Sequence, residues 1–239
     1  MTRTEIDGVL LVDKAPGMTS HDVVAIVRRR LGTKKVGHCG TLDPLATGLV
    51  IIVLGRGTKI QDLLMAEDKE YAGVMRLGEV TDSQDADGQL VESHPVPELT
   101  REQVDAAFAK YHGDFYQTPP MVSAIKKEGV PLYKLARKGQ VVEREPRLVH
   151  VFTHEVLRVE LPDIQFRVVC SKGFYVRTYA HDIGADLGCG AHLRTLRRTK
   201  SGRFSVEGAI TVDELRTFEP ELIAQRTIDL PTVSRMRGA

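Results

Sequence analysis

The stretch from Val36 to Gly55, VGHCGTLDPLATGLVIIVLG, constrains the fold more than any other part of the chain. Six consecutive aliphatic residues, 49–54, follow Gly48, and a short apolar run of this kind is typical of a buried strand. Asp43 precedes this run in a glycine-framed loop, which is a common place for a reacting group. Asp43 followed by Pro44 is also a good helix start, with the aspartate as N-cap. From the residues alone, the helix cap is the more frequent of the two roles.

Length and composition set the class of protein. The chain has 239 residues, of which 42% are hydrophobic, enough for one large domain or two small ones. No apolar run approaches the ~20 residues of a membrane span, and the N-terminal residues lack the apolar core of a signal peptide. Three scattered cysteines do not suggest a disulfide framework and favour a reducing compartment. We therefore expect a cytoplasmic protein.

The charges are segregated along the chain, although the net charge is only +1. An acidic segment lies between Glu79 and Glu92, and two basic clusters lie on either side of it. Segregation favours a polyanion-binding face and a solvated acidic face, although such clusters are more often ordinary solvated surface. The first basic cluster is Arg28, Arg29, Arg30, Lys34 and Lys35, and the second basic cluster is Arg194, Arg197, Arg198, Lys200 and Arg203.

The order of the expected elements favours a mixed α+β sheet over a doubly wound parallel one, because several linkers between strands resemble hairpins. Capping boxes at Thr19 and Thr100 predict the starts of two helices. A basic segment interrupted by proline and glycine, 121–150, indicates either a mobile arm over a ligand or, equally, a solvated surface loop. The expected strands are 8–12, 49–54, 69–77, 148–161 and 164–170.

Several common metal-binding and catalytic patterns are not found in the sequence. Cys189 and His192 have the spacing of half a zinc site, but no second pair accompanies them. Ser20, His21 and Asp22 are chain neighbours, whereas the members of a nucleophilic triad come from separate segments. No strand, glycine-rich turn and helix combine into a nucleotide-binding fingerprint. We expect no metal site.

One carboxylate in a glycine-framed loop remains, Asp43, with His38 close by in the sequence. A single aspartate without a metal or a partner base suits covalent catalysis at an electrophilic carbon. Arg177 would keep this carboxylate ionised, because a nearby cation lowers the pKa of an aspartate. The rings of Tyr71 and Tyr175 can stack on an unpaired base, and basic clusters can hold phosphates. These features are typical of a protein that acts on RNA.

Five stretches, in order over residues 8 to 217, resemble the TruB family of bacterial tRNA pseudouridine synthases. Because five ordered stretches make a specific match, the resemblance favours a catalytic Asp43 over a helix cap. The stretches are GVLLVDKAPGMTSHDVV, KKVGHCGTLDPLATGLVIIVLG, YAGVMRLGEVTDSQDADG, PPMVSAIKKEGVPLYKLARKG and CSKGFYVRTYAHDIGADLGCGAHLRTLRR.

The resemblance implies a fold, domain limits and a reaction. It implies an α+β catalytic domain over 1–217 with a mixed, largely antiparallel sheet, flanking helices and an RNA-gripping insertion over 121–150. Residues 218–239 would be a short tail in place of the full C-terminal RNA-binding domain of longer members. The implied reaction converts the T-loop uridine at tRNA position 55 to pseudouridine after flipping the base, without cofactor or metal. The implied partner is the T-arm of tRNA, and the enzyme would be a monomer.

The resemblance also implies roles for single residues. Asp43 would be the nucleophile or a general base, with Arg177 as its ion-pair partner. The alternative is a non-catalytic tRNA-binding or chaperone module, in which Asp43 is structural. The other implied substrate contacts are His38 in the space left by the flipped base, Tyr71 stacked on the target base and acting near its C5, Tyr175 in the site, Leu196 lining the pocket, and Lys14 and Lys126 near the substrate.

Overall fold

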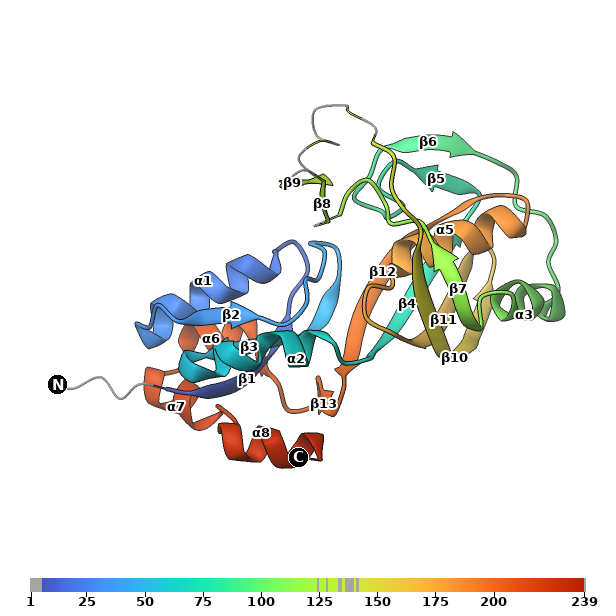
Figure 1. Ribbon diagram of the computed structural model, residues 1–239. Coiled ribbons are helices and arrows are strands. Elements are labelled where there is room, and N and C mark those ends of the chain that lie inside the picture. The colour runs from blue at the N-terminus through green and yellow to red at the C-terminus, as the bar shows by residue number, and fades with distance from the viewer. Residues whose placement is uncertain are drawn as a thin grey trace. The chain divides into compact units, whose positions relative to one another are not determined.

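The computed structural model describes residues 6–123, 125–127, 129–132, 135, 140 and 142–238 (Figure 1). The chain forms two compact units. Unit 1 consists of Met1–Tyr71 and Arg197–Ala239, and unit 2 is the intervening segment Ala72–Leu196. Unit 1 is therefore assembled from two stretches that are far apart in the sequence.

The sheet of unit 1 is built around β3. β1 pairs with β3 in antiparallel register, with Val12 opposite Val50, while β12 runs parallel to β3 at Arg197 and Arg198. Every residue of β3 from Gly48 onward is buried, which confirms the predicted buried strand. The strands with residues in unit 1 are β1 (Gly8–Lys14), β2 (Val36–His38), β3 (Thr47–Leu54), the end of β12 (Ala191–Ser201), β13 (Phe204–Ser205) and β14 (Ile210–Thr211).

Helices cover both faces of this sheet, with α1 on one side and α8 on the other (Figure 1). The Oγ1 of Thr19 accepts the backbone N–H of Asp22 at 3.1 Å, which confirms the predicted capping box. The helices of unit 1 are α1 (Ser20–Leu31), the 3-10 helix η1 (Gly55–Ile60), α2 (Gln61–Met65), α6 (Val212–Thr217), α7 (Pro220–Gln225) and α8 (Leu230–Arg237).

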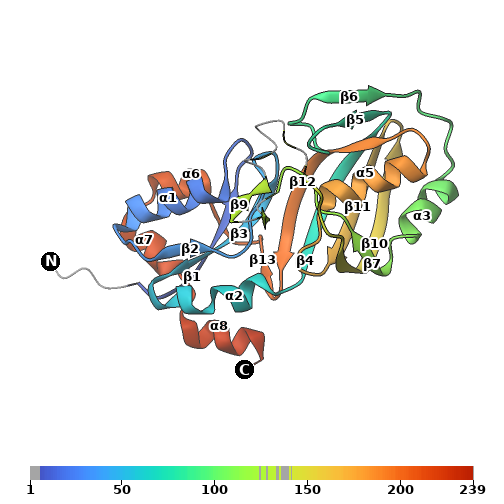
Figure 2. The ribbon, with the colours of Figure 1, turned by 45° about the horizontal axis from the view of Figure 1, so that its top comes forward.

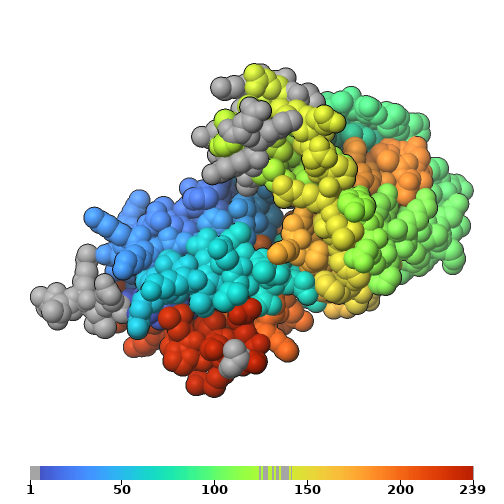
Figure 3. Space-filling view, in the orientation of Figure 1, coloured from blue at the N-terminus to red at the C-terminus, as the bar shows by residue number. Residues whose placement is uncertain are grey.

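The predicted C-terminal tail contributes α7 and α8 to unit 1. Ile228, between these helices, exchanges backbone hydrogen bonds of 2.8 and 2.9 Å with Val9 of β1. Arg237 of α8 pairs with Glu67 at 2.7 Å, where Figure 3 shows the red surface of α8 beside the cyan surface of α2. These contacts attach the tail to the sheet, and the predicted domain limit within the chain stays a prediction.

Unit 2 is a sheet with the strand order β4-β11-β10-β7. β10 pairs in antiparallel register with both β7 and β11. Two helices pack on this sheet (Figure 2). The rings of Phe108, Phe166 and Tyr179 meet with centroids 5.6–5.9 Å apart. The elements are β4 (Lys69–Leu77), α3 (Arg101–Ala109), β7 (Gly113–Gln117), β10 (Arg147–Glu160), β11 (Asp163–Cys170) and α5 (Val176–Asp186).

Two short hairpins complete unit 2, β5 (Glu79–Thr81) with β6 (Leu90–Ser93) and β8 (Lys126–Lys127) with β9 (Val130–Pro131). The second hairpin belongs to the predicted RNA-gripping insertion. Part of that insertion lies outside the described residues, as does the side chain of Lys126. Most strand pairs are antiparallel, whereas β14 is parallel to β1 and β12 to β3. The predicted mixed, largely antiparallel α+β fold is confirmed.

Candidate active site

Asp43 lies half-buried in the loop 39–46 between β2 and β3, called here the Asp43 loop. Its carbonyl oxygen accepts the backbone N–H of Ala46 at 3.1 Å. No helix begins at Pro44, because the chain bends there and enters β3 at Thr47. The helix-cap interpretation of Asp43 is therefore wrong: three residues between the aspartate and the strand leave no room for a helical turn and its hydrogen bonds.

Two buried side chains hold the backbone on either side of Asp43. The Oγ of Ser20 accepts the backbone N–H of Leu42 at 2.9 Å. The ammonium of Lys14, whose residue is 1% exposed, donates to Pro44 O at 3.3 Å. It also donates to the carbonyl oxygens of residues 15 and 18 at 3.0 and 2.8 Å. Lys14 thus fixes the chain beside Asp43, and its predicted contact with substrate stays a prediction.

His38 ends β2 and Cys39 begins the loop, and both side chains are uncharged near pH 7. Burial, and next the nearby His21, hold the pKa of His38 below its usual value; the two rings meet edge to face, with centroids 4.8 Å apart. Burial raises the pKa of the Cys39 thiol to about 12. Because the thiolate is the reactive form of cysteine, Cys39 is excluded as the nucleophile of this loop.

Tyr71 is the last residue of the first stretch of unit 1. It lies in β4, where buried and half-buried residues alternate, and Tyr71 belongs to the buried set. A strand directs alternate side chains to opposite faces, so Tyr71 shares its face with Lys69, Gly73 and Met75. Its stacking on a substrate base stays a prediction.

Arg177 of unit 2 is buried at the start of α5, with 3% of the residue exposed. Its guanidinium donates to Ser83 O at 2.8 Å and to Val122 O at 2.7 Å. Its Nε lies 3.5 Å from Oδ2 of Asp85, which is also buried. The predicted pair of Arg177 with Asp43 would join residues of different units and stays a prediction.

Asp85 is a charged residue that the sequence did not single out. It falls in the acidic segment that we interpreted as a solvated face, and for Asp85 that interpretation is wrong. A buried carboxylate needs a partner, and Arg177 supplies one 92 positions later in the chain. No local pattern marks such a pair, since the acidic residues around Asp85, with no Lys or Arg among them, resemble any exposed acidic turn.

The other predicted site residues of unit 2 are fixed by its core. The amide of the buried Gln117 side chain brackets Tyr175, accepting its N–H at 2.7 Å and donating to its carbonyl at 3.1 Å. Leu196 is buried at the middle of β12. The structure thus fixes the backbone of Tyr175 directly, while the predicted roles of both residues toward substrate stay predictions.

Most side chains of the second basic cluster bind other groups of the protein. Arg197 forms a fork with the carboxylate of Asp13, with N–O distances of 3.0 and 2.6 Å. Arg194 pairs with Asp163, and Lys200 lies 3.7 Å from Glu70. Arg198 is 1% exposed. The interpretation of this cluster as a polyanion-binding face is therefore wrong for Arg198, which has no surface to offer a phosphate.

The first basic cluster keeps more of its charge at the surface. Arg28 donates to Val36 O at 2.8 Å, and Arg30 donates to the carbonyl of Phe218. The remaining members are exposed, and they are Arg29, Lys34 and Lys35. A polyanion-binding role for these three stays a prediction.

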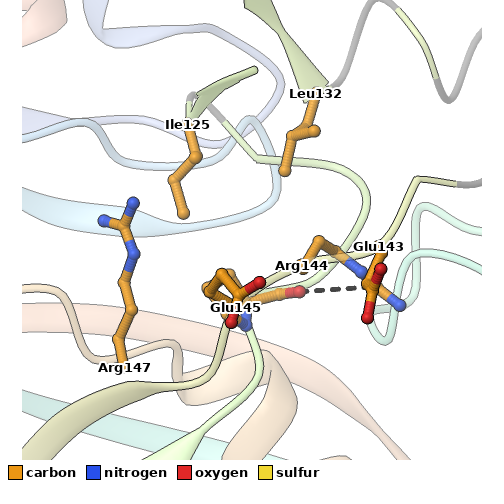
Figure 4. Close-up of a pocket in the computed structure, with 7 residues that line it drawn as sticks. Ile125, Leu132, Glu143, Arg144, Glu145 and Arg147 are labelled. Atoms are coloured by element: carbon orange, nitrogen blue, oxygen red, sulfur yellow. Dashed lines mark hydrogen bonds between the residues drawn. The ribbon is translucent and has the colours of Figure 1, made fainter.

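A pocket of about 220 Å³ lies in unit 2 within and beside the predicted insertion (Figure 4). Ile125 and Leu132 form its apolar wall, and Leu132 N–H donates to Ile125 O at 2.7 Å. Arg144 is anchored to Pro119 O at 3.1 Å, the dashed bond of Figure 4. We call it the insertion pocket; its lining residues are Pro119, Ile125, Leu132, Glu143, Arg144, Glu145 and Arg147.

The described residues form neither a metal-binding cluster nor a helix that could span a membrane. Within the part of the chain that the structure describes, no group of three His, Cys, Asp or Glu side chains is placed to hold a metal ion. The half-site residue His192 instead places its Nδ1 3.1 Å from Glu79 O. No helix among the described residues is long and apolar enough to cross a membrane.

Comparison with known protein families shows the family of this chain. The model of the TruB family pseudouridylate synthase N-terminal domain matches residues 28–176. The chain belongs to the TruB family. The model of the tRNA pseudouridylate synthase B C-terminal domain matches residues 177–225. The TruB match therefore covers both units and continues through α7.

Individual TruB relatives are similar in sequence to most of this chain. The tRNA pseudouridine synthase B of Opitutus terrae is 55% identical over 226 residues, which cover 95% of this chain and 94% of that protein. The protein of the same name from Syntrophotalea carbinolica is 50% identical over 216 residues, covering 90% and 71%. Among solved structures, a chain in a Cbf5-Nop10-Gar1 complex superposes with a TM-score of 0.75 at 30% identity. The match covers 97% of this chain and 62% of that one, so this chain spans less than two thirds of its length.

Proposed function

We propose that this protein isomerises a uridine of tRNA to pseudouridine, and that the uridine is the one at position 55 in the T-loop. The observation that carries the proposal is the match to TruB over both units, with 55% identity to a relative named tRNA pseudouridine synthase B along 94% of that relative. The reaction breaks the N1–C1′ bond and forms a C5–C1′ bond within one nucleotide. No atom is gained or lost, so no co-reactant is required.

Asp43 is the proposed catalytic residue, acting as nucleophile or general base. Its loop is held by buried side chains on both sides, and a reacting group gains from such fixed geometry. Cys39 remains a protonated thiol and His38 is neutral, which leaves the carboxylate of Asp43 as the candidate nucleophile of the loop. A carboxylate can attack an electrophilic carbon without help from a metal.

The other proposed roles concern binding of the flipped base and its RNA. Tyr71 stacks on the target base and moves a proton at C5, which requires its hydroxyl as well as its ring. Arg177 pairs with Asp43 in the complex, and Leu196 closes the pocket so that the freed base cannot escape. The remaining proposed contacts are His38 in the vacated position of the base, Tyr175 beside the base, and Lys14 and Lys126 near the RNA. The T-arm of tRNA is the partner, and the protein acts as a monomer.

Replacement of Asp43 by Asn tests the catalytic assignment. Asp43→Asn removes the charge and keeps the shape, so the variant should fold and bind tRNA, since phosphate contacts supply most of the affinity. Pseudouridine yield in a T-arm RNA, measured by chemical mapping and mass spectrometry, should fall to background. Asp213→Asn makes the same change in α6, where the carboxylate is 91% exposed, and should keep wild-type yield.

Two results would contradict the proposal. Near-normal yield from Asp43→Asn, with deamidation to Asp excluded by mass spectrometry, would remove Asp43 from catalysis. No yield from the wild-type protein on T-arm RNA, with tight binding retained, would favour the non-catalytic tRNA-binding module instead. A substrate with cytidine at position 55 tests the position, because it should bind and give no product.

A further inference from the structure

We infer that Arg198 is a positioning residue for Asp43, which fixes the backbone around the Asp43 loop instead of gripping RNA. The inference rests on the proposed function, since it gives Arg198 a role through Asp43. In the sequence, Arg198 belongs to a basic cluster that suggests a polyanion-binding face; the inference gives it a role inside the protein instead.

The guanidinium of Arg198 joins the two ends of the segment that carries Asp43. Its Nε donates to Leu49 O at 2.7 Å, and its Nη2 donates to Gly40 O at 3.2 Å. The donors of an arginine form a rigid planar fork, so one side chain sets the separation of two carbonyl oxygens that lie on either side of Asp43 in the sequence. A lysine has no such fork and cannot impose the same separation.

The strand pairing fixes where this fork begins. β12 runs parallel to β3 with Arg198 opposite Gly48. Gly48 has a φ of +98°, and a Cβ atom built on it would lie 2.3 Å from Arg198 O. Only glycine permits both this φ and this approach of the two backbones. The main chain of Arg198 is therefore held directly against the residue at which the loop enters β3.

The neighbouring residue holds β12 from the other side. Arg197 forms a two-bond fork with Asp13 on β1, and β1 pairs with β3 at Leu49 opposite Asp13. Because successive side chains of a strand point to opposite faces, one arginine reaches β1 while the next reaches the loop. The position of Arg198 is thus set by its backbone pairing and by the contacts of Arg197, independently of its own side chain.

Two other buried side chains bind residues next to Asp43, and backbone bonds join Cys39 to Ile51 and Gly17 to Pro44. Ser20 binds the N–H of Leu42 and Lys14 binds the carbonyl of Pro44. Arg198 supplies the outer pair of attachments, at residues 40 and 49. A displacement of about 1 Å in a reacting group can cost about 10²-fold in rate, so we expect the loss of the outer attachments to appear in the chemical step.

Burial separates this role from a grip on RNA. Arg198 is 1% exposed, and a contact to a phosphate requires an accessible charge whose binding releases counterions. Removal of Arg198 should therefore leave the dependence of tRNA affinity on salt unchanged.

The experiment compares Arg198→Lys and Arg198→Met with Arg216→Met, a change at an exposed arginine of α6 that pairs with Asp213. We would measure the single-turnover rate on T-arm RNA at saturating enzyme, the tRNA Kd at several salt concentrations, and the melting temperature. Rates are compared well below the melting temperature of every variant.

The expected result is a fall in the saturated single-turnover rate of about 10²-fold for Arg198→Met, with Kd and its salt slope unchanged. Arg198→Lys should restore part of the rate, because an ammonium can still bind one of the two carbonyls. Arg216→Met should match the wild type. If Arg198→Met does not fold, Arg198→Lys decides, since it keeps the charge and nearly the length.

Two outcomes would overturn the inference. A folded Arg198→Lys or Arg198→Met with the wild-type saturated rate would show that Asp43 needs no such brace. A salt slope lowered by about one unit with an unchanged saturated rate would return Arg198 to the RNA interface. Either result leaves the proposed function intact so long as Asp43→Asn is inactive, whereas an active Asp43→Asn would refute that function independently of Arg198.

Discussion

The Asp43 loop of unit 1 and the insertion pocket of unit 2 are held in different ways. The loop is fixed by the buried side chains of Lys14, Ser20 and Arg198, all bonded to backbone atoms. The pocket has an apolar wall, but three of its charged residues, Glu143, Glu145 and Arg147, are exposed. A group that reacts at one atom needs a fixed backbone, whereas a surface that meets phosphates needs accessible charge. The comparison predicts that changes at the loop affect stability and rate, and that changes at the pocket affect binding.

The largest effect is expected from Gly48→Ala, at the point where the loop enters β3. The new Cβ would meet the backbone of Arg198 at 2.3 Å, and φ is +98°, so strain and overpacking add to a loss of about 3 kcal/mol or more in unfolding free energy. Gly208→Ala is the matched control in unit 1, since its φ is +74° and nothing lies within 4 Å. That change should cost only about 1–2 kcal/mol. Equal losses in denaturant unfolding would mean that the approach of β12 to Gly48 is unimportant.

A smaller effect is expected from neutralising the arginines of the insertion pocket. Arg144→Gln with Arg147→Gln should weaken tRNA binding and lower the slope of log K against log salt by about one unit per lost phosphate contact. The melting temperature should fall only modestly, because Arg147 is exposed and Arg144 loses one hydrogen bond to Pro119 O, which is worth about 1 kcal/mol. Glu143→Gln with Glu145→Gln removes charge of the opposite sign and should strengthen binding. If both double variants leave the slope unchanged, the pocket does not face RNA.

The smallest effect is expected from the pH dependence at His38. Its pKa is lowered in the folded protein, chiefly by burial, so the unfolded chain binds the proton at higher pH than the folded one. Stability is therefore lost as the pH falls below the usual histidine pKa of about 6.5. His38→Asn should reduce this loss between pH 7 and 5. Burial also lowers the pKa of His154 in unit 2, so the dependence should be reduced and not abolished; an unaltered pH profile would contradict the assignment.

Short patterns in the sequence, such as apolar runs and capping boxes, correctly predicted individual strands and helices. The apolar run 49–54 appears as β3, and the capping box of Thr19 begins α1. The pattern around Asp43 was misleading because a cap signal concerns only the residues that follow it. β3 begins at Thr47, only four residues after Asp43, so no helical turn forms between them. Pairing in a sheet overrides a local preference when the strand is buried on both faces.

The organisation of the site could not be predicted from local patterns. Arg198 and Arg203 are equally basic in the sequence, yet Arg198 is buried in β12, where its register places it opposite Gly48 of β3, and Arg203 is exposed in the turn that follows the strand. The ion pair of Arg177 with Asp85 likewise depends on the tertiary packing of two segments that are far apart in the sequence. The roles assigned to Asp43 and its neighbours came from the family resemblance, which carries information that spacing and composition lack.

The attachment of the Asp43 loop to Arg198 has a consequence for biosynthesis. Arg198 follows Gly40 by 158 residues and Leu49 by 149, with all of unit 2 between them. At a synthesis rate of about 5–20 residues per second, the ribosome adds that interval in about 8–30 s. Throughout this time the nascent loop exists without its outer attachments, while unit 2 can complete its own sheet. Asp43 is therefore translated early and acquires its final surroundings only after the chain returns to unit 1 at Arg197.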